Sequence, residues 1–343
     1  MKKKIKKIVS LLLSATLTVT VFTACTASYD ENYVIYDLWV GGTKVTSRNQ
    51  HDILGDGTVS YSGDRQSGVL TLNGANITES SHPDDEAVII STIDQLTLNL
   101  VGENYIGMGE KAPVNGFSAF DLTITGDGSI TVGARASCIK ADIFTVESGR
   151  IDTYIKTAED EVASFIGVGL WAQELLTING GDIRVNYSSS FSPYSYGLYC
   201  VKDLVINGGS ICTSPENAML LSVGLIASEN MTVNGGNISV YGFDDAINAK
   251  TFAMTGGTAD VSSVDIFSDG VCRLVHKADF SGGSMTLTAL DKTAPESITL
   301  FSTDLTLNGV ILKGGDTADS LDNKNPSDYD YADSCIIIEE VKG

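Results

Sequence analysis

Apolar residues alternate with polar ones in short stretches along most of this chain, and a glycine corner separates each pair of stretches. The clearest copy runs Leu176-Thr177-Ile178, then Asn179-Gly180-Gly181, then Asp182-Ile183-Arg184-Val185. A period of two is that of a half-buried β-strand, so every copy predicts two short strands joined by a sharp corner. Further copies lie at Leu70 to Ile77, Leu96 to Ile106, Leu122 to Val132, Phe144 to Ile151, Leu204 to Ile211, Met231 to Val240, Phe252 to Val261, Phe280 to Leu287 and Leu305 to Leu312.

The spacing of these copies predicts a solenoid, because about ten copies recur at intervals of roughly 20 to 30 residues. Asn-Gly corners also suit β-hairpins. Here a longer segment and then a near copy follow each corner, so parallel pairing with the next copy satisfies more backbone groups. We therefore expect an all-β fold, a right-handed parallel β-helix of about ten rungs. Equivalent corners would then stack, and a side-chain ladder is expected at Asn73, Asn179, Asn207, Asn234 and Asn308.

The ends of the chain differ in composition from the repeats. Residues 33–66 contain Trp39 and turn signals such as Gly55-Asp56-Gly57, and they predict an N-terminal β cap. Residues 67–315 carry the repeats and predict the β-helix. Residues 316–343 are polar and acidic, end in an apolar run, and predict a C-terminal cap over an otherwise open sheet edge.

The first residues are typical of a targeting segment. Five Lys among the first seven residues precede an apolar stretch, and Phe22-Thr23-Ala24-Cys25 resembles a lipobox. This predicts a lipoprotein signal peptide at 1–24, lipidation of Cys25, a tether at 25–32, and attachment to the extracellular face of the cell membrane. The alternative is cleavage near Ala27 and free secretion.

Charge and cysteine content narrow the function. The residues after the basic N-terminus carry 17 Lys and Arg against 43 Asp and Glu, a net charge of −26. Such an excess repels phosphate backbones and anionic lipids, which excludes nucleic acid as a partner and favours divalent cations and neutral ligands. Five cysteines follow Cys25 at irregular spacing and are interpreted as small buried residues of the strands. Hydrolase elbows, phosphate-binding loops and dinucleotide fingerprints are missing from the sequence.

One acidic segment has the composition of a cation site. Asp244-Asp245-Ala246-Ile247-Asn248 places two carboxylates and an amide beside a predicted strand, and hard cations prefer oxygen ligands. The next copy adds Asp265 and Asp269, which would lie close by if the copies stack in register. Calcium at these five residues is therefore the predicted cofactor, and a solvated acidic loop is the alternative.

The same segment carries a family resemblance. Asp-Asp-Ala-Ile-Asn-Ala before a strand and a Thr-Gly-Gly corner, together with Tyr36 to Val45 and Ile53 to Tyr61 ahead of the repeats, is similar to secreted parallel β-helix proteins of Gram-positive anaerobes. That family comprises calcium-binding, cellulose- and pectin-binding surface proteins. The resemblance implies polysaccharide binding without established catalysis, supported by calcium between rungs.

Three functions are therefore open. The first is a surface-anchored protein that binds plant-type or other extracellular polysaccharide, with Phe191, Tyr194 and Tyr196 as contact residues in an aromatic insertion. The second is an adhesin or structural stalk that binds no glycan. The third is a β-helix polysaccharide lyase. The sequence favours a non-enzymatic role and does not indicate the oligomeric state.

Overall fold

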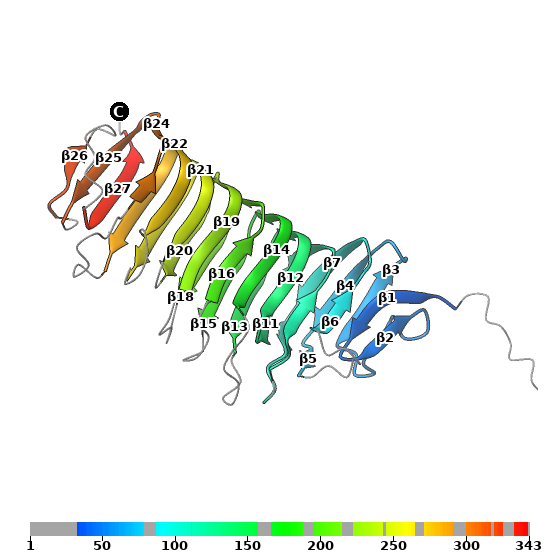
Figure 1. Ribbon diagram of the computed structural model, residues 1–343. Coiled ribbons are helices and arrows are strands. Elements are labelled where there is room, and N and C mark those ends of the chain that lie inside the picture. The colour runs from blue at the N-terminus through cyan, green and yellow to red at the C-terminus, as the bar shows by residue number, and fades with distance from the viewer. Residues whose placement is uncertain are drawn as a thin grey trace, which may run out of the picture. The chain divides into compact units, whose positions relative to one another are not determined.

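The computed structural model describes residues 33–78, 87–110, 112–156, 166–187, 195–214, 222–242, 245–264, 271–290, 300–316, 319–324 and 333–341. The chain divides into two compact units, Met1–Val34 and Ile35–Gly343, and only the second contains described elements. Every element described is a β-strand (Figure 1). Over these residues, no helix has the length and apolar character needed to cross a lipid bilayer.

Parallel strands form three stacks, which we name A, B and C, and successive copies of the repeat lie side by side in each stack (Figure 1). Several strands are long enough to turn a corner and to belong to two or, for β21 and β22, all three stacks. Stack A contains β6 (Ala87–Ser91), β9 (Asn115–Ser118), β16 (Ser195–Cys200), β23 (Leu300–Ser302) and the first parts of β12 (Ser137–Val146), β14 (Gly167–Ile178), β19 (Ser222–Val233), β21 (Ile247–Ser263) and β22 (Cys272–Ala289).

The other two stacks continue the same copies. Stack B contains β4 (Ser67–Asn73), β7 (Gln95–Val101), β10 (Asp121–Gly126), β17 (Asp203–Ile206), β24 (Leu305–Leu307) and the later parts of β12, β14, β19, β21 and β22. Stack C contains β5 (Asn76–Ile77), β8 (Glu103–Ile106), β11 (Ser129–Ala134), β13 (Arg150–Ile155), β15 (Asp182–Tyr187), β18 (Ser210–Ser214), β20 (Asn237–Gly242) and the ends of β21 and β22.

The strict register of the stacks builds the hydrophobic core. In stack B the partners of successive strands form one continuous buried column: Leu98, Ile124, Val146, Ile178, Ile206, Val233, Met254 and Phe280. Burying each such side chain contributes about 1.5 to 3 kcal/mol relative to leaving it exposed. A copy cannot bury its apolar residues alone, since the neighbours in every column come from the copies before and after it. The predicted all-β fold with parallel pairing is confirmed for these strands, and the hairpin alternative is wrong for them.

The two glycines of each corner meet two different constraints. A Cβ at Gly208 would lie 2.6 Å from the carbonyl oxygen of Asn179 in the preceding copy, so the first position has no room for a side chain. Gly209 has φ of 81°, a conformation that L-residues with a side chain rarely adopt. The pairs Gly180-Gly181, Gly235-Gly236, Gly256-Gly257 and Gly282-Gly283 repeat this arrangement.

A ladder of polar side chains lines the same corner. The Nδ2 of Asn207 donates to Oδ1 of Asn179 at 2.8 Å, and the Nδ2 of Asn234 donates to Oδ1 of Asn207 at 2.8 Å. Glu147 accepts from Asn179 at one end, and the hydroxyl of Thr255 donates to Asn234 at the other. The predicted ladder is confirmed for its three central asparagines.

The ladder is shorter than predicted. In the described part of the chain no side-chain hydrogen bond joins Asn73 or Asn308 to it. The register explains the first case, because Val101 is the strand partner of Asn73 and offers no polar side chain.

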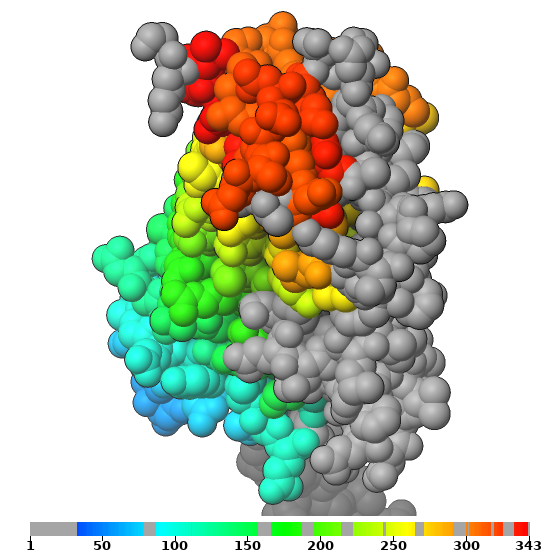
Figure 2. All heavy atoms as spheres, turned by 90° about the vertical axis from the view of Figure 1, so that its left-hand side faces the viewer, coloured from blue at the N-terminus to red at the C-terminus, as the bar shows by residue number. Residues whose placement is uncertain are grey.

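Antiparallel strands cover part of the edge at each end of the stacks. At the first edge, β1 (Ile35–Val40) pairs with β6, β3 (Val59–Gly63) pairs with β4, and β2 (Thr43–Thr46) pairs with β1. At the last edge, β27 (Cys335–Glu340) lies between β22 and β25 (Val310–Gly315), and β26 (Asp322–Lys324) pairs with β25. Figure 2 looks onto this end, where the orange and red residues face the viewer. Covered edges cannot pair with the edge of another molecule.

The antiparallel region begins earlier than the sequence suggests. Parallel pairing is predicted as far as residue 315, yet β25 pairs only with β26 and β27. The physical reason is that β27 occupies the place beside β22 that the next parallel strand would take.

The cysteines in the described residues are free thiols within or beside the core. Cys138, Cys200, Cys272 and Cys335 are buried, and Cys212 is half-buried. Burial raises the pKa of the Cys138 thiol to about 12. The interpretation of the cysteines as small buried residues of the strands is confirmed for four of the five, and Cys212 is a strand residue that is only half-buried.

Stacking at the corners predicts different costs for two glycine substitutions. Gly74 and Gly209 both have positive φ, but a Cβ at Gly74 meets nothing within 4 Å, whereas one at Gly209 lies 2.8 Å from the backbone of the preceding copy. We expect Gly74→Ala to cost about 1 to 2 kcal/mol and Gly209→Ala about 1 to 3 kcal/mol more. Denaturant unfolding of both variants and the parent measures the difference, and equal losses would contradict it.

Candidate functional site

One outward position on the strands of stack A forms a row of large and polar side chains. Leu170, Leu198 and Leu225 point inward and are buried, and the residue after each of them points outward. Strand pairing places these outward residues side by side, one strand spacing of about 4.8 Å apart. In register the row reads Lys140, Trp171, Tyr199, Ile226, Asn248 and Arg273.

Aromatic rings dominate the middle of this row. The rings of Tyr196 and Tyr199 lie 5.5 Å apart between centroids, with their planes tilted by 43°. Trp171 is the strand partner of Tyr199, and the Nζ of Lys140 lies 5.2 Å from the centroid of the Trp171 ring. All three rings are half-buried, so each presents part of its surface to solvent. We call Trp171, Tyr196 and Tyr199 the aromatic row.

Such a row suits a flat, extended ligand. Aromatic rings contact the apolar faces of other rings, and tyrosine hydroxyls accept and donate hydrogen bonds at the rim. Because the row spans neighbouring strands of a regular stack, its contacts repeat along one direction rather than converging on a single point.

Of the three predicted contact residues, the structure describes Tyr196 and places it in the aromatic row. Phe191 and Tyr194 lie outside the described residues. Trp171 and Tyr199 were not predicted, although the sequence carries a signal for them. The segments Val168-Gly169-Leu170-Trp171-Ala172 and Tyr196-Gly197-Leu198-Tyr199-Cys200 share one pattern, in which a large residue stands at the outward position after a buried leucine.

Two of the five predicted calcium ligands are described. The Nδ2 of Asn248 donates to Oδ2 of Asp245 at 2.8 Å, and only 4% of Asp245 is exposed. Burial, together with the nearby Asp245 carboxylate, raises the pKa of the Cys272 thiol. Asp244, Asp265 and Asp269 lie outside the described residues, as does Cys25. No group of three His, Cys, Asp or Glu side chains suited to a metal gathers within the part of the chain that is described.

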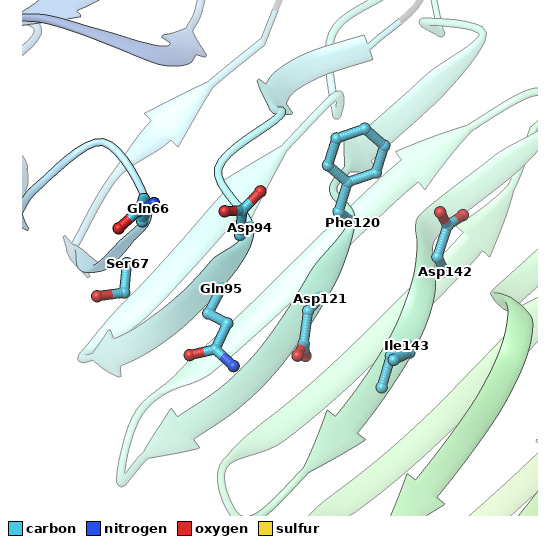
Figure 3. A pocket seen from close by; sticks show the side chains of 8 residues that line it. All are labelled: Gln66, Ser67, Asp94, Gln95, Phe120, Asp121, Asp142 and Ile143. Carbon is cyan, nitrogen blue, oxygen red and sulfur yellow. The ribbon is translucent and has the colours of Figure 1, made fainter.

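A pocket of about 600 Å³ lies at the corner where stack A passes into stack B (Figure 3). Its walls come from four successive copies of the repeat, at the starts of β4, β7 and β10 and in the middle of β12. The lining residues are Gln66, Ser67, Asp94, Gln95, Phe120, Asp121, Asp142 and Ile143. We call this the corner pocket.

The corner pocket combines an exposed ring with carboxylates. Phe120 is 46% exposed and Ile143 is 39% exposed. In Figure 3 the carboxylates of Asp94 and Asp142 lie on either side of Phe120, and Asp121 lies below it. Burial raises the pKa of Asp121. The lining residues include three carboxylates and no Lys, Arg or His.

Farther along the same corner, charges are balanced within the protein. Glu174 forms an ion pair with Lys202 of the next copy, and Glu229 pairs with Lys250 at 2.5 Å. The carboxamide of Asn230 donates to Asp203 at 2.6 Å. Each of these contacts joins neighbouring copies, and the corner pocket lacks an equivalent for its carboxylates among the described residues.

Comparison with known proteins points to carbohydrate. Residues 154–270 match the family model described as carbohydrate-binding domain-containing protein. The matched segment contains the whole aromatic row and ends before the last repeats; the corner pocket lies outside it. The match agrees with the carbohydrate-binding part of the resemblance found in the sequence and does not bear on calcium or secretion.

Two further comparisons add little. No curated protein matches the chain. A solved structure described as a polysaccharide lyase-like protein from C. thermocellum, in a gadolinium derivative, is 15% identical and covers 80% of this chain and 96% of its own, with a TM-score of 0.33. Similarity at that level carries no argument about function.

Proposed function

We propose that this protein binds an extracellular polysaccharide along the aromatic row and acts as a binding protein rather than as an enzyme. The observation that carries the proposal is the in-register placement of Trp171 and Tyr199 on neighbouring strands, with Tyr196 against Tyr199. The family match supports carbohydrate binding, because it covers these three residues. Rings at one strand spacing offer repeated stacking surfaces to a chain of sugar rings.

We further infer that stacks A, B and C are the three sides of one right-handed parallel β-helix of about ten rungs. The shared register of the three stacks supports this, since the same copies follow one another in each of them. In a β-helix the outward face of stack A is flat and continuous, as an extended glycan requires.

Calcium is proposed as the supporting ion, held by Asp244, Asp245, Asn248, Asp265 and Asp269. The hydrogen bond that Asn248 donates to Asp245 supports the proposal, because it places two of the five side chains next to each other near a strand edge; hard cations prefer the oxygen atoms that both side chains carry. Asn248 also lies in the outward row of stack A. An ion there would fix the end of the surface that carries the aromatic row.

Glycan binding is tested by retention on insoluble polysaccharide. We expect the parent protein to co-sediment with cellulose or pectin, and Trp171→Ala and Tyr199→Ala to weaken retention about ten-fold each, a loss of about 1.4 kcal/mol. Tyr105→Ala is the matched control, because Tyr105 is 39% exposed and lies in stack C. If none of a broad set of glycans binds the protein, the hypothesis of an adhesin or structural stalk without glycan binding replaces the glycan-binding proposal. Release of unsaturated uronate products would instead favour the lyase.

The calcium proposal predicts a shift in thermal stability. An ion that binds only the folded state raises the melting temperature, so we expect calcium to raise it and a chelator to reverse the rise. Asp245→Asn should abolish the calcium-dependent increment, whatever its effect on stability without calcium. Asp127→Asn, an exposed carboxylate in a turn, should preserve it. A melting temperature that is the same with calcium and with chelator would rule out the site.

Lipid attachment at Cys25 is proposed on the lipobox-like sequence Phe22-Thr23-Ala24-Cys25. Mass spectrometry of the mature protein from membranes should show an N-terminal Cys25 with a diacylglycerol mass increment. Cys25→Ser should release the protein into the medium. A mature protein that begins at Ser28 without modification would show that it is secreted freely.

A further inference from the structure

We propose that the corner pocket is a second binding site, which takes a sugar-sized organic cation, specifically the protonated amine of a non-acetylated amino sugar. It lies outside residues 154–270 and shares no residue with the aromatic row. The inference therefore stands or fails independently of the proposed function.

The corner pocket has the shape and size of a small-molecule site. The outward face of stack A is a regular row, whereas the corner pocket is a concavity of about 600 Å³. Small-molecule sites have volumes of about 300 to 1,000 Å³, so the pocket has room for one or two sugar rings. The corners that wall it differ in length, since four residues separate Ile90 from Gln95 and two separate their strand partners Ser118 and Asp121.

The corner pocket carries negative charge. Asp94, Asp121 and Asp142 line the pocket, and no hydrogen bond or ion pair engages their side chains within the described part of the chain. The carboxylates that follow at the same corner are neutralised by lysines of adjacent copies, as in Glu174 with Lys202 and Glu229 with Lys250. The three carboxylates without such a partner lie at the concavity. A cationic ligand supplies the missing charge, and a uronate or a sulfated sugar is repelled.

The corner pocket also contains an exposed aromatic ring. Phe120 is 46% exposed at the pocket, with carboxylates on both sides of it (Figure 3). An ammonium group gains from an aromatic face as well as from carboxylates, and the carbon skeleton of a sugar gains from apolar contact with the same ring. A small, strongly hydrated metal ion requires several oxygen ligands and gains nothing from Phe120.

Two basic residues are close in sequence to the lining residues, Arg65 directly before Gln66 and Lys140 before Asp142, and neither forms an ion pair with a lining carboxylate within the described part of the chain. Lys140 lies two residues before Asp142 on β12, and its ammonium group lies over the Trp171 ring at 5.2 Å. That contact places the cation of this strand at the aromatic row and away from the corner pocket. The two surfaces therefore differ in the sign of the charge beside their aromatic rings. A lysine lies beside the rings of the aromatic row, and carboxylates lie beside Phe120 in the corner pocket.

The experiment compares free and acetylated amino sugars on the intact protein. Calorimetric titration with short oligomers of glucosamine should give binding at least ten-fold tighter than titration with the matching oligomers of N-acetylglucosamine or glucose. Phe120→Leu, which keeps apolar volume and removes the ring, should weaken glucosamine binding, and Asp142→Asn should weaken it about ten-fold. Asp304→Asn is the matched control, an exposed carboxylate in the connection from β23 to β24 that lies outside the pocket.

Two readouts separate this site from the proposed function. Trp171→Ala should weaken retention on neutral polysaccharide about ten-fold and leave binding of glucosamine oligomers unchanged. Raising the salt concentration, or raising the pH until the amine is neutral, should weaken binding by the parent protein, and this readout needs no variant to fold. Equal affinity for the free and acetylated oligomers, or full affinity in both Phe120→Leu and Asp142→Asn, would overturn the proposal.

Discussion

The whole structure depends on how closely the backbone of one copy approaches the backbone of the next at the glycine corner. At Gly180, Gly208 and Gly235 a Cβ on the first glycine would lie 2.5 to 2.6 Å from the glutamate or asparagine carbonyl oxygen of the preceding copy. With a side chain there, the corner would have to move away, and the strands on either side would lose their hydrogen bonds with the neighbouring copy. The second glycine sets the direction of the chain as it leaves the corner. Stacking, and not the stability of any single copy, is therefore what these residues specify.

The register between copies determines which side chains lie together on the protein surface. Once two copies are aligned at the corner, residues that are distant in sequence become neighbours on one face, as Trp171 and Tyr199 do. The same rule aligns opposite charges, so that Glu174 meets Lys202. Exposed ion pairs of this kind contribute little to stability, about 0 to 1 kcal/mol each. Their main effect is on the surface potential, because they leave the corner pocket as a distinct acidic region.

Features that every copy of the repeat shares can be predicted from the sequence. Features that depend on differences between copies cannot be predicted in the same way. Alternation and the Gly-Gly corners are sufficient to predict the strands, their parallel pairing and the ladder from Asn179 to Asn234, since each follows from one copy and its neighbour. Trp171 and Tyr199 were not predicted, because the aromatic residues of the insertion at 187–196 are a stronger sequence signal than one aromatic residue within each strand. The corner pocket could not be predicted, because its concavity depends on how corners of unequal length lie against one another. The predicted site around Asp245 is intermediate, since its contact with Asn248 is local in sequence while Asp265 and Asp269 come from the next copy.

The corner formed by Asn207, Gly208 and Gly209 has nearly the same geometry as those before and after it. A gene duplication that inserts one whole copy would therefore meet a matching corner on both sides and would lengthen each stack by about 4.8 Å. Loss of a whole copy would shorten the stacks by the same amount. Changes in units of one copy alter the reach of the surface while preserving its chemistry, whereas a single-residue insertion within a strand would reverse which side chains face the core.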